Sequence, residues 1–362
     1  MPAVQAAANR TETTMRKLLF GLAILAIILG GAWFAGESWL SGAARDVIAA
    51  RQDMSASVSA LRQPGRIGLH LQDIEVADGA SGTASLSGLD AYVRLRSPTT
   101  LTLDLPRNVT VQQVDGAETA IALGNGQAEA RIDPTRGMAV SQVRIAGREM
   151  TLNQAALFEA LTVTARLTHM GGAAPAGSAA AYRIDLDGAG LVSGSLPETL
   201  DISGAIQVWL DRLPDRTVLE GSVPPPQPTG LQTQDLTVSL GDMTARLAAR
   251  VEADEDGLAQ GQAAIYTSDG PAFVDTAVAA GLLTPEIATP LQTLMINLAA
   301  KTDETAPADT ANVNDPADNI AEEEVTLPQA GPGEVRLPIF FGNGIMRLGP
   351  IPLGPAPRIA GF

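Results

Sequence analysis

From Arg66 onward, apolar and polar residues alternate along most of the chain. The alternation recurs in short runs such as Ile67, Leu69 and Leu71, and a period of two places the apolar side chains of a strand on one face. Turn-forming residues separate the runs, for example Asp187-Gly188, Asp256-Gly257 and Gly342-Asn343-Gly344. The pattern predicts a mainly β fold, a long, curved antiparallel meander that is either groove-like or a closed sandwich.

Two stretches have helical spacing instead. Between residues 37 and 63, apolar residues such as Ala44 and Ile48 recur three or four positions apart until Pro64, which predicts a helical stalk. Residues 271–300 contain two further apolar faces of this kind, and we expect a small helical pair that covers one end of the sheet.

The amino-terminal segment predicts a membrane anchor at residues 18–36. The run that begins at Leu18 contains 18 residues without a charge, and such a helix spans about 27 Å. Arg16 and Lys17 precede it, so the positive-inside rule places residues 1–17 in the cytoplasm and the body in the periplasm. Trp33 and Trp39 then lie where an aromatic belt contacts the membrane interface.

Two alternatives remain open at this end of the chain. A cleaved signal peptide would also place the body outside the cytoplasm, although the apolar run is longer than is usual for one. Met15 stands directly before Arg16 and is an alternative start to Met1. Under either alternative, the body belongs to the bacterial envelope.

The composition of the rest of the chain predicts how it is divided into segments. Residues 64–223 form a first β-rich part and residues 231–300 a second, and the proline-rich segment 224–230 between them is the predicted internal boundary. Residues 301–326 are strongly acidic and nearly devoid of apolar residues, which predicts a disordered linker. Residues 327–362 contain a last hairpin and a proline-rich tail.

Charge and residue types exclude several classes of function. The net charge of −16 disfavours nucleic acid as a partner, and the absence of cysteine excludes disulfides and thiolate metal sites. His70 and His169 have no partner at metal-ligand spacing. The acidic stretch before Gly257 resembles a calcium loop, but its closing position is Ala263, which cannot bind the ion. We therefore expect no catalytic, cofactor or metal site.

The two ends of the chain carry a resemblance to a known family. The anchor ends in Gly-x-Trp-Phe, and the hairpin of residues 334–348 is followed by the proline-patterned segment 349–357. Together these features resemble an uncharacterised bacterial envelope family, domain of unknown function 2125 (DUF2125). The closing segment is also similar to that of AsmA-type envelope proteins, which are associated with lipid traffic or outer-membrane assembly. The resemblance implies an envelope protein and transfers no catalytic residue.

These observations favour a non-enzymatic, membrane-anchored protein that interacts with lipid or envelope components. An aliphatic sheet face would shield acyl chains from water, although taken singly each residue of such a face is better explained as ordinary core. The alternative is a scaffold that binds envelope proteins through edge strands or through the helical pair. The candidate groove residues are Ile67, Leu69, Leu71, Leu101, Leu103, Leu105, Val143 and Ile145.

Overall fold

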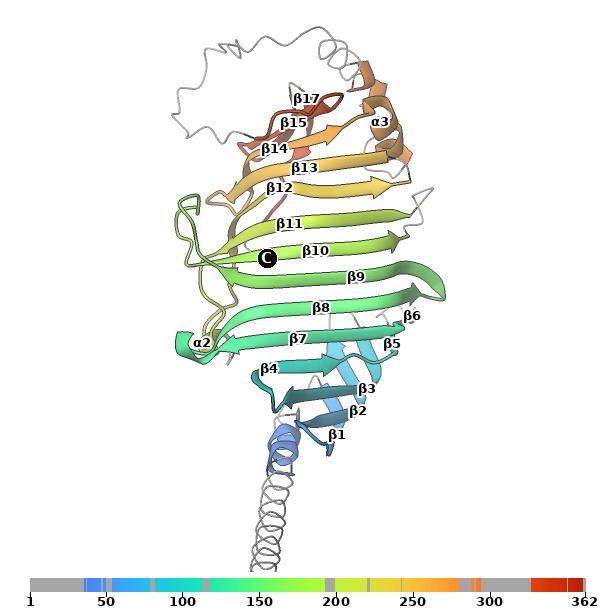
Figure 1. Cartoon of the computed structure of the whole chain (residues 1–362), viewed down its shortest axis with the longest axis vertical. Helices are drawn as coiled ribbons and strands as arrows, with labels where there is room; N and C mark the ends of the chain where they lie inside the picture. Colours follow the sequence, from blue (N-terminus) through green and yellow to red (C-terminus); the bar gives the residue numbers. More distant parts are fainter. Residues whose placement is uncertain are drawn as a thin grey trace, which may run out of the picture. The chain divides into compact units, whose positions relative to one another are not determined.

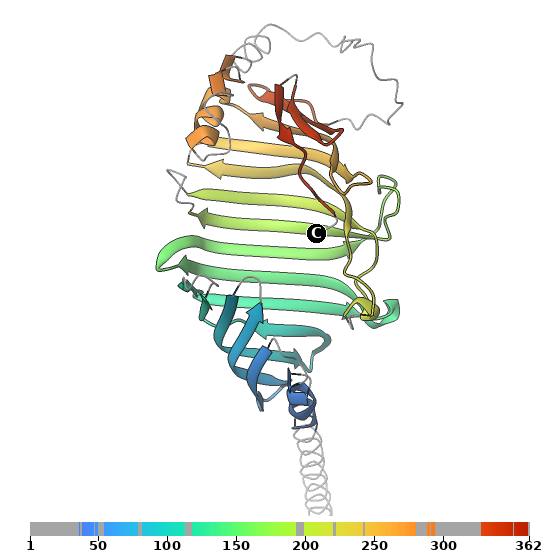
Figure 2. The same ribbon diagram turned by 180° about the vertical axis from the view of Figure 1, so that it is seen from behind.

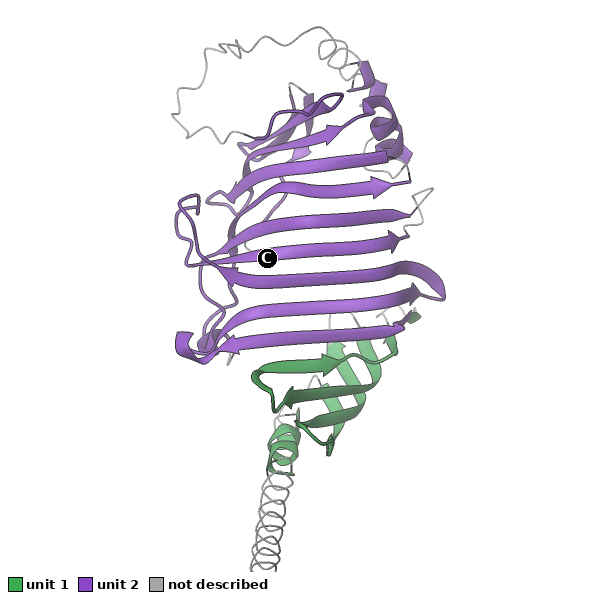
Figure 3. Cartoon of the chain, in the orientation of Figure 1, with its two compact units in different colours: residues 1–120 green, residues 121–362 purple. Residues whose placement is uncertain are grey.

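Antiparallel strands make up most of the chain that the structure describes, which confirms the predicted mainly β fold. The chain divides into two compact units, residues 1–120 and 121–362 (Figure 3). The computed structural model describes residues 36, 38–46, 48–49, 54–78, 82–112, 118–192, 199–219, 222–241, 243–279, 288–289, 291–293, 327–349 and 351–360.

The first unit is a small antiparallel sheet. Strand β2 pairs with β1 on one side and with β3 on the other. The long strand β3 has two further partners, because β4 pairs with its C-terminal half and β5 with its N-terminal half. A sixth strand, β6 (Glu118–Ala122), crosses the division between the units. The strands of the first unit are β1 (Met54–Ala60), β2 (Arg66–Asp78), β3 (Gly82–Arg94), β4 (Ser97–Asp104) and β5 (Asn108–Gln112).

A helical segment packs on this sheet. Residues 38–46 and 48–49 are helical, and Ala44 and Ile48 lie against a buried cluster that contains Val58 and Leu71. Arg45 donates two hydrogen bonds to the carbonyl oxygen of Val58, at 3.0 Å from Nε and 2.8 Å from Nη2. The segment is therefore fixed to β1 by both apolar contact and hydrogen bonding.

The predicted helical stalk at residues 37–63 is wrong in its second half. Residues 54–60 form strand β1, which pairs with β2 from Met54 to Ala60. The residues Met54, Ala56, Val58 and Ala60 also alternate with polar residues, and a period of two fits a strand better than a helix. Pairing with the long strand β2 favours the strand over the helix at these residues.

Most of the predicted anchor lies outside the described residues, as do Arg16, Lys17, Leu18 and Trp33. Within the described ranges, no helix is both long and apolar enough to cross a membrane. Trp39 is described, and 74% of its surface is exposed on the helical segment.

The second unit is an antiparallel meander in which each strand from β7 to β17 pairs with the next along the chain. Figures 1 and 2 show its long strands stacked one above the other. Its strands are β7 (Asn125–Asp133), β8 (Ala139–Leu152), β9 (Ala155–Thr168), β10 (Ala180–Leu191), β11 (Leu200–Leu210), β12 (Pro228–Leu240), β13 (Met243–Ala253), β14 (Ala259–Thr267), β15 (Val335–Gly342), β16 (Ile345–Leu348) and β17 (Ile351–Pro355). Its helices are η1 (Pro134–Arg136), α2 (Arg216–Leu219) and α3 (Gly270–Ala279).

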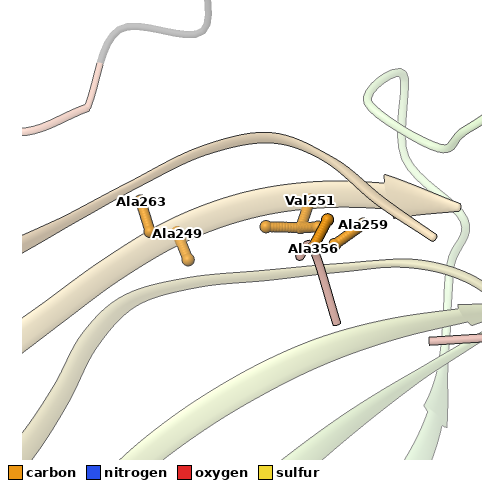
Figure 4. Close-up of a cluster of buried hydrophobic side chains, with 5 residues drawn as sticks. All are labelled: Ala249, Val251, Ala259, Ala263 and Ala356. Atoms are coloured by element: carbon orange, nitrogen blue, oxygen red, sulfur yellow. The ribbon is translucent and has the colours of Figure 1, made fainter. Parts of the chain in front are cut away.

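The C-terminal part of this meander is covered on both faces. On one face, Val274 of α3 packs against Leu337, and Ala356 of the tail packs beside Val251 and Ala259 (Figure 4). On the other face, Leu327 packs on a cluster that contains Tyr266. The predicted helical pair is confirmed at α3, and residues 288–289 and 291–293 are also helical.

Two predicted breaks in the β pattern are wrong. The proline-rich segment 224–230 is not a boundary, because β12 begins at Pro228 and pairs with β11, and the division between units falls after residue 120. Asp187-Gly188 lies inside β10 and is no turn. By contrast, the hairpin at Gly342-Asn343-Gly344 is confirmed, with positive φ at Asn343 and Gly344. The acidic segment 301–326 lies outside the described residues.

Candidate functional site

Strands β7 to β12 present one continuous aliphatic face. In an antiparallel pair, residues directly opposite each other point to the same side of the sheet. One cross-strand row runs through Val143, Ala165, Ile184 and Ile206. The cross-strand rows on either side of it also consist mainly of aliphatic residues that point to the same side of the sheet. We call this surface the open apolar face; it comprises Ala128, Ala130, Val143, Ile145, Leu161, Val163, Ala165, Ile184, Leu186, Ile202, Ile206 and Val238.

The members of this face lie outside the buried clusters of the described residues, whereas Tyr182, Leu236 and Leu240, which continue the same side of the sheet, are buried. None of the buried hydrophobic clusters of the described chain includes a residue of the open apolar face. Ile145 is 46% exposed, and the other members remain partly accessible to solvent. The contrast is with β13–β16, where α3 and the tail cover the sheet.

The opposite face of the same strands is mainly polar, apart from the buried pair Ala181 and Trp209 at one end. Asp185 accepts hydrogen bonds from Arg166 at 2.6 Å and from Arg183 at 3.0 Å. The positions on this side alternate with those of the open apolar face, as in Arg144 beside Val143 and Thr162 beside Val163. The sheet therefore has one charged side, which is suited to water, and one aliphatic side.

Glycines leave room for large neighbours in one row of the face. Gly147 lies opposite Leu161, which in turn lies opposite Gly188 and then Ile202. A Cβ atom at Gly188 would lie 3.0 Å from Cγ2 of Ile202 and 3.2 Å from Cδ1 of Leu161. The apolar side chains thus lean over the glycine backbone, and this packing explains why Gly188 lies in a strand.

The connection between β11 and β12, residues 211–227, closes one end of these strands. It reaches back to the β7–β8 turn, where the Val140 amide donates to the Pro214 carbonyl at 2.8 Å and the Arg216 amide donates to the Gly137 carbonyl at 3.3 Å. The Tyr182 hydroxyl donates to the carbonyl of Val140. This end of the sheet is therefore held together by bonds from three separate segments.

Tyr182 makes this end sensitive to high pH. Burial raises the pKa of the Tyr182 phenol from 10.0 to about 12, because the charged phenolate is poorly solvated there. The folded state thus favours the neutral phenol, so its contribution to stability is present below pH 10 and lost as pH rises from 10 to 12.

We expect Tyr182→Phe to remove this part of the pH dependence. The midpoint of urea unfolding, measured at pH 9, 11 and 12, should fall more steeply for the wild type than for the variant. Equal losses in both proteins would contradict the role given to Tyr182.

The candidate groove residues are divided between the two units. Six of them, Ile67 to Leu105, belong to the first unit, whereas Val143 and Ile145 belong to the second. Leu71 is 9% exposed and lies with Leu69 in the cluster covered by the helical segment, so both are core residues. Val143 and Ile145 lie on the open apolar face. The prediction missed the members on β9, such as Leu161 and Val163, although their alternation was visible in the sequence.

Polar groups that would carry chemistry are sparse. Among the described residues, no group of three or more His, Cys, Asp or Glu is arranged to hold a metal ion. His70 lies on the polar side of its strand, and its Nδ1 is hydrogen-bonded to Asp90 on the neighbouring strand. Apolar surface is therefore the main feature from which a function can be argued.

Comparison with known proteins identifies one family. Residues 33–357 match the family described as "Uncharacterized protein conserved in bacteria (DUF2125)". No curated protein and no solved structure matches the chain.

Proposed function

The chain belongs to the DUF2125 family of bacterial proteins, and we propose that this member binds the acyl chains of lipids on its open apolar face. The single observation that supports the proposal is an aliphatic face over β7–β12 whose members lie outside the buried clusters of the described residues and remain partly exposed. A partly exposed apolar face of this kind is energetically unfavourable unless a ligand or partner removes it from water.

The size of the face fits more than one acyl chain. Neighbouring strands lie about 4.8 Å apart, so six strands span about 24 Å, and three alternate positions along a strand span about 13 Å. Covering about 310 Å² at about 25 cal/mol per Å² yields about 8 kcal/mol before the cost of immobilising the ligand. Several chains that lie side by side, as in a lipid with more than one acyl chain, would cover the face.

A second copy of the chain fits this face less well. Two such faces packed together would remove about 600 Å² from water, which is below the range of about 1,200–2,000 Å² for stable protein interfaces. The edge strands of the sheet also give little support to the scaffold alternative. Arg45 occupies an outward carbonyl of β1, and prolines interrupt β17 at Pro352 and Pro355, where a strand-adding partner needs amide donors.

The proposal includes the location predicted from the sequence. Residues 18–36 would anchor the chain in the inner membrane, and the body would lie in the periplasm, where acyl chains of envelope lipids need shielding from water. The similarity to AsmA-type proteins agrees with such a role and stays a prediction. A scaffold that binds envelope proteins is the alternative outcome.

The proposal can be tested by native mass spectrometry of the full chain, purified in a mild detergent. We expect peaks heavier than the polypeptide by the mass of one or more lipids, and their release on collisional activation. A chain that retains no lipid, and that also binds no fluorescent fatty-acid probe, would contradict lipid binding and favour the scaffold alternative.

A further inference from the structure

Two neighbouring hairpin tips of the first unit concentrate positive charge. The β1–β2 connection and the adjoining start of β2, residues 61–66, contain Arg62 and Arg66, and the β3–β4 turn, residues 94–97, contains Arg94 and Arg96. The amide of Leu95 donates to the Gly65 carbonyl at 3.1 Å, so the two tips lie side by side. Neither segment contains an acidic residue, although the whole chain carries a net charge of −16.

An apolar side chain stands at the centre of this charge. Leu95 is 61% exposed, and Pro64 in the adjoining tip is also exposed. An exposed leucine flanked by arginines on both sides matches the composition of protein segments that contact the headgroup region of a bilayer. Arginines there attract anionic lipids, while the leucine enters the boundary with the acyl chains.

Two of the arginines are held in place beneath the tips. Arg66 stacks over the ring of Tyr92 at 4.4 Å from its centroid, and Arg94 lies 5.8 Å from the same centroid. Asp104 lies 3.9 Å from Arg66 and offsets part of its charge. The two segments together contain four arginines and no acidic residue, and Arg62 and Arg96 are exposed at their ends.

We propose that these basic tips, residues 61–66 and 94–97, dock on an anionic membrane surface, with Leu95 inserted among the headgroups. Ala44 and Ile48 of the helical segment pack on the same small sheet, and this segment follows the predicted anchor in sequence. In the proposed function, that anchor would hold the first unit at the bilayer. Docking would orient an otherwise acidic body on an anionic membrane, which would repel the rest of its surface.

The absence of cysteine allows a direct test. The full chain carrying Leu95→Cys is labelled with an environment-sensitive fluorophore and reconstituted into vesicles of phosphatidylcholine with or without phosphatidylglycerol. A matched label at Asp256→Cys marks the exposed, acidic β13–β14 turn. We expect headgroup-region spin labels to quench the Leu95 label in vesicles that contain phosphatidylglycerol and to leave the Asp256 label unquenched.

Removal of positive charge distinguishes electrostatic docking of the tips from their mere proximity to the membrane. At about 1 kcal/mol per arginine near an anionic surface, Arg62→Gln combined with Arg96→Gln should lower the equilibrium constant for docking about 30-fold, and high salt should act in the same direction. Ile145→Glu with Val163→Glu, which affects the open apolar face, should leave the quenching of the Leu95 label unchanged. Equal exposure of the Leu95 and Asp256 labels in anionic vesicles, or quenching that is insensitive to both charge and salt, would overturn the proposal.

Discussion

Replacement of Ile145 and Val163 by glutamate is expected to weaken binding of a fluorescent acyl probe at least about a hundredfold, because two carboxylates would have to be buried against hydrocarbon. These residues are a directly opposed pair on β8 and β9 of the open apolar face. Both side chains are partly exposed, so we expect the variant to fold.

The same two strands supply a matched control for this variant. Ala146 and Thr162 are the next opposed pair, and they point to the polar face. Ala146→Glu with Thr162→Glu adds the same two charges at the same spacing, and we expect it to leave probe binding unchanged. Probe titration of both variants, with thermal unfolding as a check of folding, distinguishes the outcomes. Equal loss of binding in both variants would show that charge, and not the apolar face, controls binding.

Gly204→Ala is expected to destabilise the second unit by about 3 kcal/mol. Gly204 has a φ of +140°, and a Cβ atom there would lie 2.5 Å from the carbonyl oxygen of Asp235. The close approach arises at an irregularity between β11 and β12, where the steps from Ser203 to Gln207 on β11 oppose the longer stretch from Gln232 to Thr237 on β12. Both the backbone conformation and the space exclude a side chain.

Gly172→Ala is the control for this substitution. Gly172 lies in the β9–β10 connection with no atom within 4 Å of an added Cβ, so we expect a change within about 0.5 kcal/mol. Urea unfolding followed by circular dichroism measures both variants. Equal unfolding midpoints for the two would contradict the close packing assigned to Gly204.

The alternation of apolar residues was sufficient to predict the class of fold and many of the strands. The period-two run Val143 and Ile145, for example, lies in β8 with both side chains on one face, as expected. The pattern could not show which faces are covered. Leu69 and Leu71 alternate in the same way as Val143 and Ile145, yet a helical segment distant from β2 in sequence covers them. Coverage depends on tertiary contacts, and the period of a single strand contains no information on them.

The sequence-based predictions were wrong where the same residues fit two different structural patterns. Met54 and Val58 are four positions apart, which suits a helix, but Ala56 and Ala60 complete an alternation that suits a strand. Asp187-Gly188 has the composition of a turn, but Gly188 lies in mid-strand because large side chains of neighbouring strands fill the space above it. The candidate site was therefore predicted only at Val143 and Ile145, and its other members emerged from the pairing of β7 to β12.

The central claim is that acyl chains lie on the open apolar face, and photocrosslinking tests it most directly. The full chain would be incubated with a phospholipid that carries a diazirine in its acyl chain, irradiated, digested and analysed for labelled peptides. We predict labelled residues on β8 to β11 at the positions of Ile145, Val163, Leu186 and Ile206, with Ala146 and Thr162 on the opposite face unlabelled. Labelling confined to residues 18–36, or spread equally over both faces of the sheet, would contradict the account.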